Sequence, residues 1–268
     1  MHLSTQQQQT YEQKGFVLIT NQFSTEEINK INNEIDNIIN NDNSYKLFEE
    51  DGKTIRLLYG FHLNNEFFSN LSQDYRLVEP AKQMLKSEVY IHWFKINFKA
   101  AFNGDIWAWH QDYTYLNELD GLSTPQAINV ILFLDDVDQF NAPLYLIPGS
   151  HQENNNNVIG EDDIEINNDT GTSFMATQDR YSTDKKTVAK LVSRYGIESA
   201  TGVAGTILCI HPQCIHASPS NISPYNRKIM TITYNSVNNI PIPVEKQRSE
   251  LIVGRNYTPI KSICTKQS

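Results

Sequence analysis

One short polar motif restricts the possible folds of this chain more than any other feature. His110 and Asp112, in Trp-His-Gln-Asp, stand two positions apart, so in an extended strand both side chains would leave the same face. His216, which follows the apolar run that begins at Gly205, could supply a third ligand to the same metal ion. Two histidines and one carboxylate describe a non-haem Fe(II) site that keeps open positions for substrate and O2. The fold must therefore bring distant β segments together.

A basic residue follows the third candidate ligand at a useful spacing. Arg227 lies eleven residues after His216 and opens a segment that predicts a strand. A guanidinium on a neighbouring strand can bind a carboxylate through two parallel hydrogen bonds, which 2-oxoglutarate needs at the end remote from the metal. Plainer interpretations stay open: His110 and Asp112 could be a hydrogen-bonded pair within a strand, and Arg227 could form a surface ion pair.

Apolar and polar residues alternate from Val89 onward, which predicts the first long strand of a β core. A continuous apolar run at 129–134 is typical of a strand covered on both faces, and the turn-rich segment 135–143 leads to another β segment at Leu144. We therefore expect a mainly β core at about 89–237. The alternating residues are Phe94, Ile96 and Phe98 against Lys95, Asn97 and Lys99.

The N-terminal part, at about 24–86, is predicted to be helical. Ser24 and Glu27 form a capping-box signature before an isoleucine stripe, and 74–85 has apolar residues at helical spacing. A short strand is expected at Gly15-Phe-Val-Leu-Ile. Residues 152–200 are predicted to form an insertion with a helix from Asp184, and it could be either a lid over substrate or a surface loop without a role.

Composition limits the class of partner. The 268 residues suit a single domain, 1–268, and the formal net charge of -9 argues against nucleic acid or an anionic membrane as partner. We expect a small-molecule substrate and a monomer or homodimer. Three cysteines are too few for a disulfide framework, and the start of the chain is polar and Gln-rich, which favours the cytoplasm.

Five sequence blocks, in order, resemble the phytanoyl-CoA dioxygenase family, in particular its branch near the ectoine hydroxylases. The likeness spans nearly the whole chain, from Gly15-Phe to Arg255-Asn-Tyr-Thr-Pro. It implies a mainly β fold with flanking helices, a double-stranded β-helix (jelly roll, cupin-like), and a reaction that uses Fe(II), 2-oxoglutarate and O2 to oxidise an unactivated C–H bond. The blocks are Trp109-His-Gln-Asp-Tyr, Asp120-Gly-Leu, Phe133-Leu-Asp-Asp-Val, Pro143-Leu-Tyr-Leu-Ile-Pro-Gly-Ser-His and the segment from His216 to Arg227.

The resemblance also implies roles for single residues. It makes His110, Asp112 and His216 the iron ligands and Arg227 the partner of the distal carboxylate of 2-oxoglutarate. Ser218 would support that carboxylate, although Ser before Pro219 is also an ordinary turn former. Lys99 would be a further cofactor-binding residue, on the same strand face as Asn97.

Departures from the ectoine hydroxylases bear on the substrate. Trp93 stands where that branch has Gln, and Leu116 stands where it has Trp, so ectoine is not the expected substrate. Trp93, Asn97 and Leu116 are candidate substrate-lining residues, while the retained carboxylate of Asp112 favours hydroxylation over chlorination.

We expect hydroxylation of a small polar metabolite, a free amino acid or a cyclic imino acid. Two alternatives stay open. One is desaturation, cyclisation or epimerisation of a larger natural product at the same iron site. The other is a non-catalytic jelly roll that binds a ligand.

Overall fold

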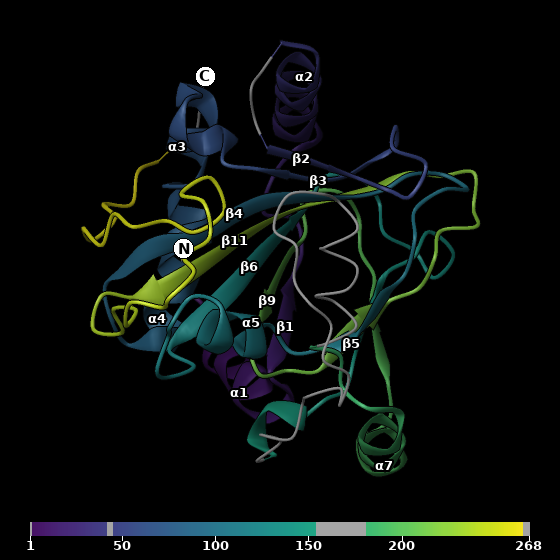
Figure 1. The fold of residues 1–268 in the computed structure, drawn as a ribbon, viewed down its shortest axis with the longest axis vertical. Coiled ribbons are helices and arrows are strands. Elements are labelled where there is room, and N and C mark those ends of the chain that lie inside the picture. Colours follow the sequence, from purple (N-terminus) through teal and green to yellow (C-terminus); the bar gives the residue numbers. More distant parts are fainter. Residues whose placement is uncertain (1, 42–44, 154–180, 265–268) are drawn as a thin grey trace.

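Two antiparallel β-sheets form the centre of the structure, a computed structural model that describes residues 2–41, 45–153 and 181–264 (Figure 1). The larger sheet has the strand order β1 (Phe16–Ile19), β9 (Ile207–Ile210), β6 (Ala127–Phe133), β11 (Arg227–Ser236), β4 (Val89–Lys99), β3 (Ile55–Tyr59) and β2 (Tyr45–Phe48). The smaller sheet has the order β5 (Trp107–His110), β10 (His216–Ser218), β7 (Leu144–Leu146) and β8 (Glu198–Ala200).

The strand order confirms the expected mainly β fold, a double-stranded β-helix with flanking helices. Neighbours in the larger sheet come from distant parts of the chain: β11 lies between β4 and β6, and β9 lies between β6 and β1. In the smaller sheet His216 of β10 pairs directly with His110 of β5. The two histidines of the motif are therefore brought together by strand register.

Helices cover the outer face of the larger sheet. They are α1 (Thr5–Lys14), α2 (Thr25–Asn41), α3 (Glu66–Leu71) and α4 (Tyr75–Leu85). Helix α5 (Asp112–Glu118) follows β5, and helix α7 (Lys185–Tyr195) precedes β8. Short 3-10 turns occupy Phe61–Leu63 and Ser150–Gln152. The contacts of α4 are with β4, β6 and β11.

The N-terminus of α2 has the cap that the sequence predicts. The backbone N–H of Ser24 donates to Glu27 Oε2 at 2.8 Å, and the N–H of Glu27 donates to Ser24 Oγ at 3.3 Å. The isoleucine stripe of this helix is buried in the core beneath the larger sheet, where each such side chain contributes roughly 1.5–3 kcal/mol. The buried members are Ile28, Ile31, Ile35 and Ile38.

The inner face of the larger sheet changes character along its length. Toward one end, Phe133 and Leu208 pack with Leu146 and Cys214 from the side of the smaller sheet in an apolar cluster. Elsewhere on this face β4, β6 and β11 carry polar residues in register with one another. The polar residues are Lys95, Asn97, Asn129, Thr231 and Thr233. The candidate ligands lie beside this polar part.

Two expectations were wrong in detail, and one helix was not expected. Asp112 does not continue the strand of His110: β5 ends at His110 and Asp112 is the first residue of α5, with Gln111 as its N-cap. The part at 24–86 is not wholly helical, because β2 and β3 form a hairpin that extends the larger sheet beside β4. Helix α1 was not expected, because its sequence is polar and almost without an apolar stripe.

The predicted insertion 152–200 is described only in part. Its helix is present as α7, capped by the Asp184 side chain, which accepts from the N–H groups of Lys186 and Thr187. Residues 198–200 form β8 at the edge of the smaller sheet. Residues 154–180, with the Asn-rich and acidic stretches, lie outside the described residues, so the question of a lid stays open. Within the ranges described, none of the helices has the length and apolar character needed to cross a bilayer.

Candidate metal centre

His110, Asp112 and His216 converge at one place, as the sequence predicts. One ligand-type atom from each of the three lies within 4.8 Å of the others. His110 Nε2 is 3.7 Å from Asp112 Oδ1, and His216 Nε2 is 3.8 Å from Asp112 Oδ2. The residues are 8%, 6% and 7% exposed, so they are buried without being sealed off completely.

Backbone carbonyls fix which nitrogen of each imidazole is available. His110 Nδ1 lies 2.7 Å from the carbonyl oxygen of Ala108, and His216 Nδ1 lies 2.9 Å from that of Cys214. A carbonyl can only accept, so each Nδ1 carries the proton and each Nε2 lone pair faces the shared site. Burial, with the nearby His216, lowers the pKa of His110 to about 4, so this imidazole is neutral near pH 7.

Hydrogen bonding and nearby positive charge keep Asp112 ionised. Asn129 Nδ2 donates to Asp112 Oδ2 at 2.5 Å, and Thr233 Oγ1 donates to Asn129 Oδ1 at 2.6 Å, which fixes the orientation of the amide. Burial is the largest effect on the carboxyl and raises its pKa, but Lys95 and His216 oppose it and the net pKa is lowered. Asp112 is therefore a carboxylate aimed at the two Nε2 atoms.

This donor set fits Fe(II). Two imidazoles and one carboxylate, with their ligand atoms within 4.8 Å of one another, match the two-histidine, one-carboxylate arrangement that non-haem iron oxygenases use. Second partners such as Asn129 and the two carbonyls hold the ligands in orientation, as is general for metal sites in proteins.

Arg227 and Ser218 lie together, in agreement with the sequence prediction. Arg227 Nη2 donates to Ser218 Oγ at 2.9 Å, and both residues donate to the carbonyl oxygen of Ala142. Arg227 is 2% exposed, and burial lowers its pKa to about 9, which leaves it charged near pH 7. Within the described part of the chain, its Nη1 has no hydrogen-bond acceptor. This nitrogen can still donate to a carboxylate.

Lys99 pairs with Arg227 across β4 and β11, but its ammonium is already used. It donates to the carbonyl oxygens of Asp105 and Pro219, the latter at 2.8 Å. Burial, followed by the charge of Arg227, lowers its pKa to about 6. Direct contact of Lys99 with a cofactor would require it to leave these carbonyls, so its predicted role stays a prediction.

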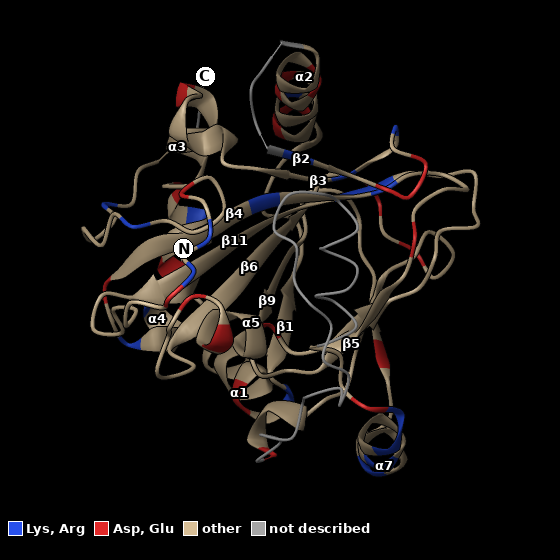
Figure 2. Ribbon diagram, in the orientation of Figure 1, with Lys and Arg blue, Asp and Glu red and all other residues tan. Residues whose placement is uncertain are grey.

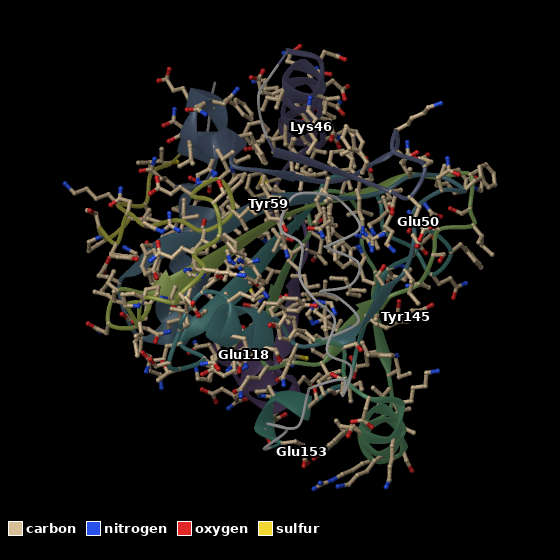
Figure 3. The ribbon with its side chains drawn as sticks, viewed as in Figure 1. Lys46, Glu50, Tyr59, Glu118, Tyr145 and Glu153 are labelled. Carbon is tan, nitrogen blue, oxygen red and sulfur yellow. The ribbon has the colours of Figure 1, made fainter. Side chains whose placement is uncertain are left out.

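The candidate substrate-lining residues fall into two groups. Trp93 and Leu116 share an apolar cluster, and the indole N–H of Trp93 donates to Asp120 at 2.8 Å. Asn97 lies on the inner face of β4, where Thr231 Oγ1 reaches its side-chain oxygen at 3.5 Å. Figure 3 shows side chains filling the space between the sheets, with Tyr59 of β3 on one side and Tyr145 of β7 on the other.

The sequence did not single out several residues that surround the centre. Asn129 is one, because only the register of β6 against β11 places it beneath Asp112. Arg248 is another: it binds Asp120 from a segment without regular secondary structure. The position of Lys95 could be predicted from the sequence. Apolar and polar residues alternate along this strand, which places Lys95 on the same face as Asn97.

The sequence of this chain is similar to those of enzymes that act on small amino-acid-like compounds. Residues 11–229 match the family model described as Phytanoyl-CoA dioxygenase (PhyH). An L-proline trans-4-hydroxylase of Streptomyces griseoviridis is 33% identical over 254 residues, which cover 93% of this chain and 92% of the relative. An ectoine dioxygenase of Halomonas elongata is 31% identical over 241 residues, which cover 88% of this chain and 71% of the relative.

A solved structure agrees with these relatives. The crystal structure of EctD from S. alaskensis with 2-oxoglutarate and 5-hydroxyectoine superposes with a TM-score of 0.81 and 25% sequence identity. The match covers 98% of this chain and 88% of that chain. The likeness therefore extends over both sheets and the helices around them.

Proposed function

Because the chain belongs to the phytanoyl-CoA dioxygenase family, we propose that it is an Fe(II)- and 2-oxoglutarate-dependent dioxygenase that hydroxylates a small free amino acid or cyclic imino acid. The single observation that carries this proposal is the convergence of His110, Asp112 and His216, whose ligand atoms lie within 4.8 Å of one another. A non-catalytic jelly roll would have no need of this set, nor of the bonds that orient each member.

The three residues would hold iron through His110 Nε2, His216 Nε2 and an oxygen of Asp112. The chemistry that iron would supply here is activation of O2 coupled to oxidative decarboxylation of 2-oxoglutarate. The protein contributes orientation. The carbonyls of Ala108 and Cys214 keep both imidazoles in the tautomer that binds metal, and Asn129 keeps one oxygen of the carboxylate in place.

Arg227 and Ser218 would bind the distal carboxylate of 2-oxoglutarate. Arg227 offers the Nη1 donors, and the Ser218 hydroxyl can turn from Ala142 to the ligand. The resulting hydrogen bonds would fix the keto acid at its far end and so set the orientation of its keto group.

The substrate class follows the relatives that match the chain over most of their length, above all the L-proline trans-4-hydroxylase. Trp93 and Leu116 support an apolar wall, since they pack together with Leu122 and Val253. The polar N–H of Trp93 is taken up by Asp120, so it is not offered to a ligand. We propose that ectoine is a poor substrate for this reason.

Two further parts of the proposal concern the chain as a whole. We propose that residues 1–268 act as one catalytic domain, because β1 completes one edge of the larger sheet and Arg248 reaches back to Asp120 near the centre. We also propose a cytoplasmic enzyme, which the three unpaired thiols support.

The test is anaerobic titration of the protein with Fe(II), followed by succinate formation with 2-oxoglutarate and a panel containing L-proline, pipecolate and ectoine. We expect stoichiometric metal binding and succinate that depends on a cyclic imino acid. His110→Ala, Asp112→Ala and His216→Ala should each lose both, whereas His2→Ala, at an exposed histidine, should lose neither. Sustained succinate production by the ligand variants would contradict the assignment.

A further inference from the structure

Lys95 lies on the inner face of β4, close to the candidate metal centre. It pairs with Thr231 of β11 and Tyr59 of β3, and its strand neighbour on the same face is Trp93. Trp93 pairs with Thr233, the residue that orients the amide supporting Asp112. Figure 2 shows basic residues on β4, whereas β6 and β9 have no charged residue.

The ammonium of Lys95 has no hydrogen-bond acceptor among the residues that the structure describes. Its one close partner there is the ring of Trp93, 4.9 Å from Nζ to the centroid. Other buried cations are satisfied: Arg56 binds Glu49 at 2.6 Å and Arg76 binds Asp74 at 2.8 Å. The charge of Asp112 acts on Lys95, but no carboxylate of the described residues forms a direct ion pair with its ammonium. A partly buried ammonium without a direct acceptor is costly, so its presence points to a ligand.

A second carboxylate beside this wall, Asp120, already binds other groups. Asp120 accepts from Trp93 Nε1 at 2.8 Å, from His92 Nε2 at 2.9 Å, and from Arg248 Nη2 at 2.6 Å and Nε at 2.8 Å. Three of these donors reach Oδ2 and one reaches Oδ1, and the ion-pair partner of Asp120 is Arg248. Among the described residues, Asp120 therefore forms its ion pair with Arg248 and not with Lys95.

Two cations lie close to the indole ring of Trp93. Arg248 stands 5.0 Å from the ring centroid, and Lys95 stands 4.9 Å from it. Asp120 fixes the indole and the guanidinium together, so this wall combines a rigid apolar surface with an ammonium, that of Lys95, that has no hydrogen-bond acceptor among the described residues. These properties suit a compact ring or short aliphatic chain that carries a carboxylate.

We propose that Lys95 is a specificity-determining residue that binds the carboxylate of the substrate, while Trp93 packs against its hydrocarbon part. The inference rests on the proposed function and narrows it: the substrate is an amino or imino acid with a free carboxylate, and its amide or decarboxylated analogue is excluded. Lys95 lies on the rung next to that of Trp93, Thr233 and Asn129, and Asn129 supports Asp112, so a carboxylate bound by Lys95 would hold a small ring near the metal ligands.

The experiment compares the wild type with Lys95→Met, which keeps length without charge, and with Lys95→Arg, which keeps charge. Lys53→Met, at an exposed position, is the matched control. Calorimetry under anaerobic conditions measures the binding of L-proline, L-pipecolate, pyrrolidine and piperidine to the Fe(II)- and 2-oxoglutarate-loaded proteins. Affinities for Fe(II) and 2-oxoglutarate are measured first for each variant.

We expect the wild type to bind the imino acids on the order of 10- to 100-fold more tightly than the matching amines, the range for a hydrogen bond to a charged group. Lys95→Met should lose this difference and keep its affinity for Fe(II) and 2-oxoglutarate. Lys95→Arg should retain part of it, and Lys53→Met all of it.

Four results would overturn the proposal. The wild type could bind pyrrolidine as tightly as L-proline, or bind none of the carboxylates. Lys95→Met could leave the ratio of imino acid to amine unchanged. The main effect of Lys95→Met could be a loss of affinity for Fe(II) or 2-oxoglutarate, which would mean that Lys95 supports Asp112 or binds the keto acid. Failure of the wild type to bind Fe(II) and 2-oxoglutarate would instead refute the proposed function.

Discussion

The amide of Asn129 donates a 2.5 Å hydrogen bond to Oδ2 of Asp112, so the middle strand β6 directly supports the carboxylate of the metal centre. The two residues come from different elements, and Thr233 of β11 fixes which end of the amide faces Asp112. The position of one ligand thus depends on the order of strands in the larger sheet.

Asn129→Ala should weaken Fe(II) binding by roughly 10- to 100-fold, because partners that orient metal ligands typically contribute that much. Thr233→Val should have a smaller effect in the same direction, since the amide keeps its place but loses the bond that selects its orientation. Anaerobic Fe(II) titration measures both. Equal metal affinity in Asn129→Ala and the wild type would mean that Asp112 needs no such support.

Arg227→Lys should raise the Kd for 2-oxoglutarate by roughly 30-fold or more, although the charge is kept. The reason is geometric: an ammonium cannot bind Ser218 and Ala142 and at the same time present a second planar donor. Ser218→Ala should cost about 1 kcal/mol of 2-oxoglutarate binding. Both variants should bind Fe(II) normally, and a parallel loss of metal would point to misfolding.

Arg76→Met should lower the free energy of unfolding by about 3 kcal/mol, because it leaves the fully buried carboxylate of Asp74 without its ion-pair partner. Lys14→Met removes the exposed Lys14–Glu198 pair and should cost well under ~1 kcal/mol. Denaturant unfolding of both variants, at matched salt, measures the difference.

The effect of Arg76 should depend on pH through Glu27. Burial raises the pKa of Glu27, but hydrogen bonds from Arg76 and Ser24 lower it below its ordinary value of 4.5. A carboxyl with a lowered folded pKa stabilises the protein fully above 4.5, and this contribution is lost as the pH falls through the folded value. The stability gap between the wild type and Arg76→Met should therefore narrow below pH 4.5. A gap that widens on acidification would contradict this account.

Gly121→Ala should destabilise the protein more than Gly52→Ala. Both glycines have positive φ, 81° and 66°, so alanine is strained at each. A Cβ at Gly121 would also lie 1.9 Å from the carbonyl oxygen of Ile242, whereas one at Gly52 would meet nothing within 4 Å. The additional loss, on the order of 1–3 kcal/mol for overpacking, should appear in thermal or denaturant unfolding. The clash would displace the segment that carries Arg248.

The convergence of the candidate ligands could be predicted from the sequence, because their signals are local or follow from their order along the chain. The spacing of His110, His216 and Arg227 within apolar segments predicted strands that meet, and the cap of α2 was readable from Ser24 and Glu27. The sheet residue Asn129 gave no signal, because its role depends on register with a strand some hundred residues later. The start of α5 at Asp112 was not predicted. The two-residue spacing of His110 and Asp112 fits a continuous strand as well as a strand that ends and turns into a helix.

Lys95 and Asp120 show a different limit. The alternation in β4 placed Lys95 on the inner face, yet its lack of an acceptor is visible only when all neighbouring strands are in place. Asp120 was noted as part of a motif, but its four donors come from β4 and from the C-terminal segment.

Because His110 pairs directly with His216, metal binding requires the correct register of β5 and β10. A slip of one residue between β5 and β10 would turn one imidazole to the opposite side of the smaller sheet. Only chains that have aligned these two short strands can offer both nitrogens. Metal uptake during refolding would therefore report when β5 and β10 have paired. Bound iron would then stabilise the pairing of β5 and β10, two strands of four and three residues that form few hydrogen bonds of their own.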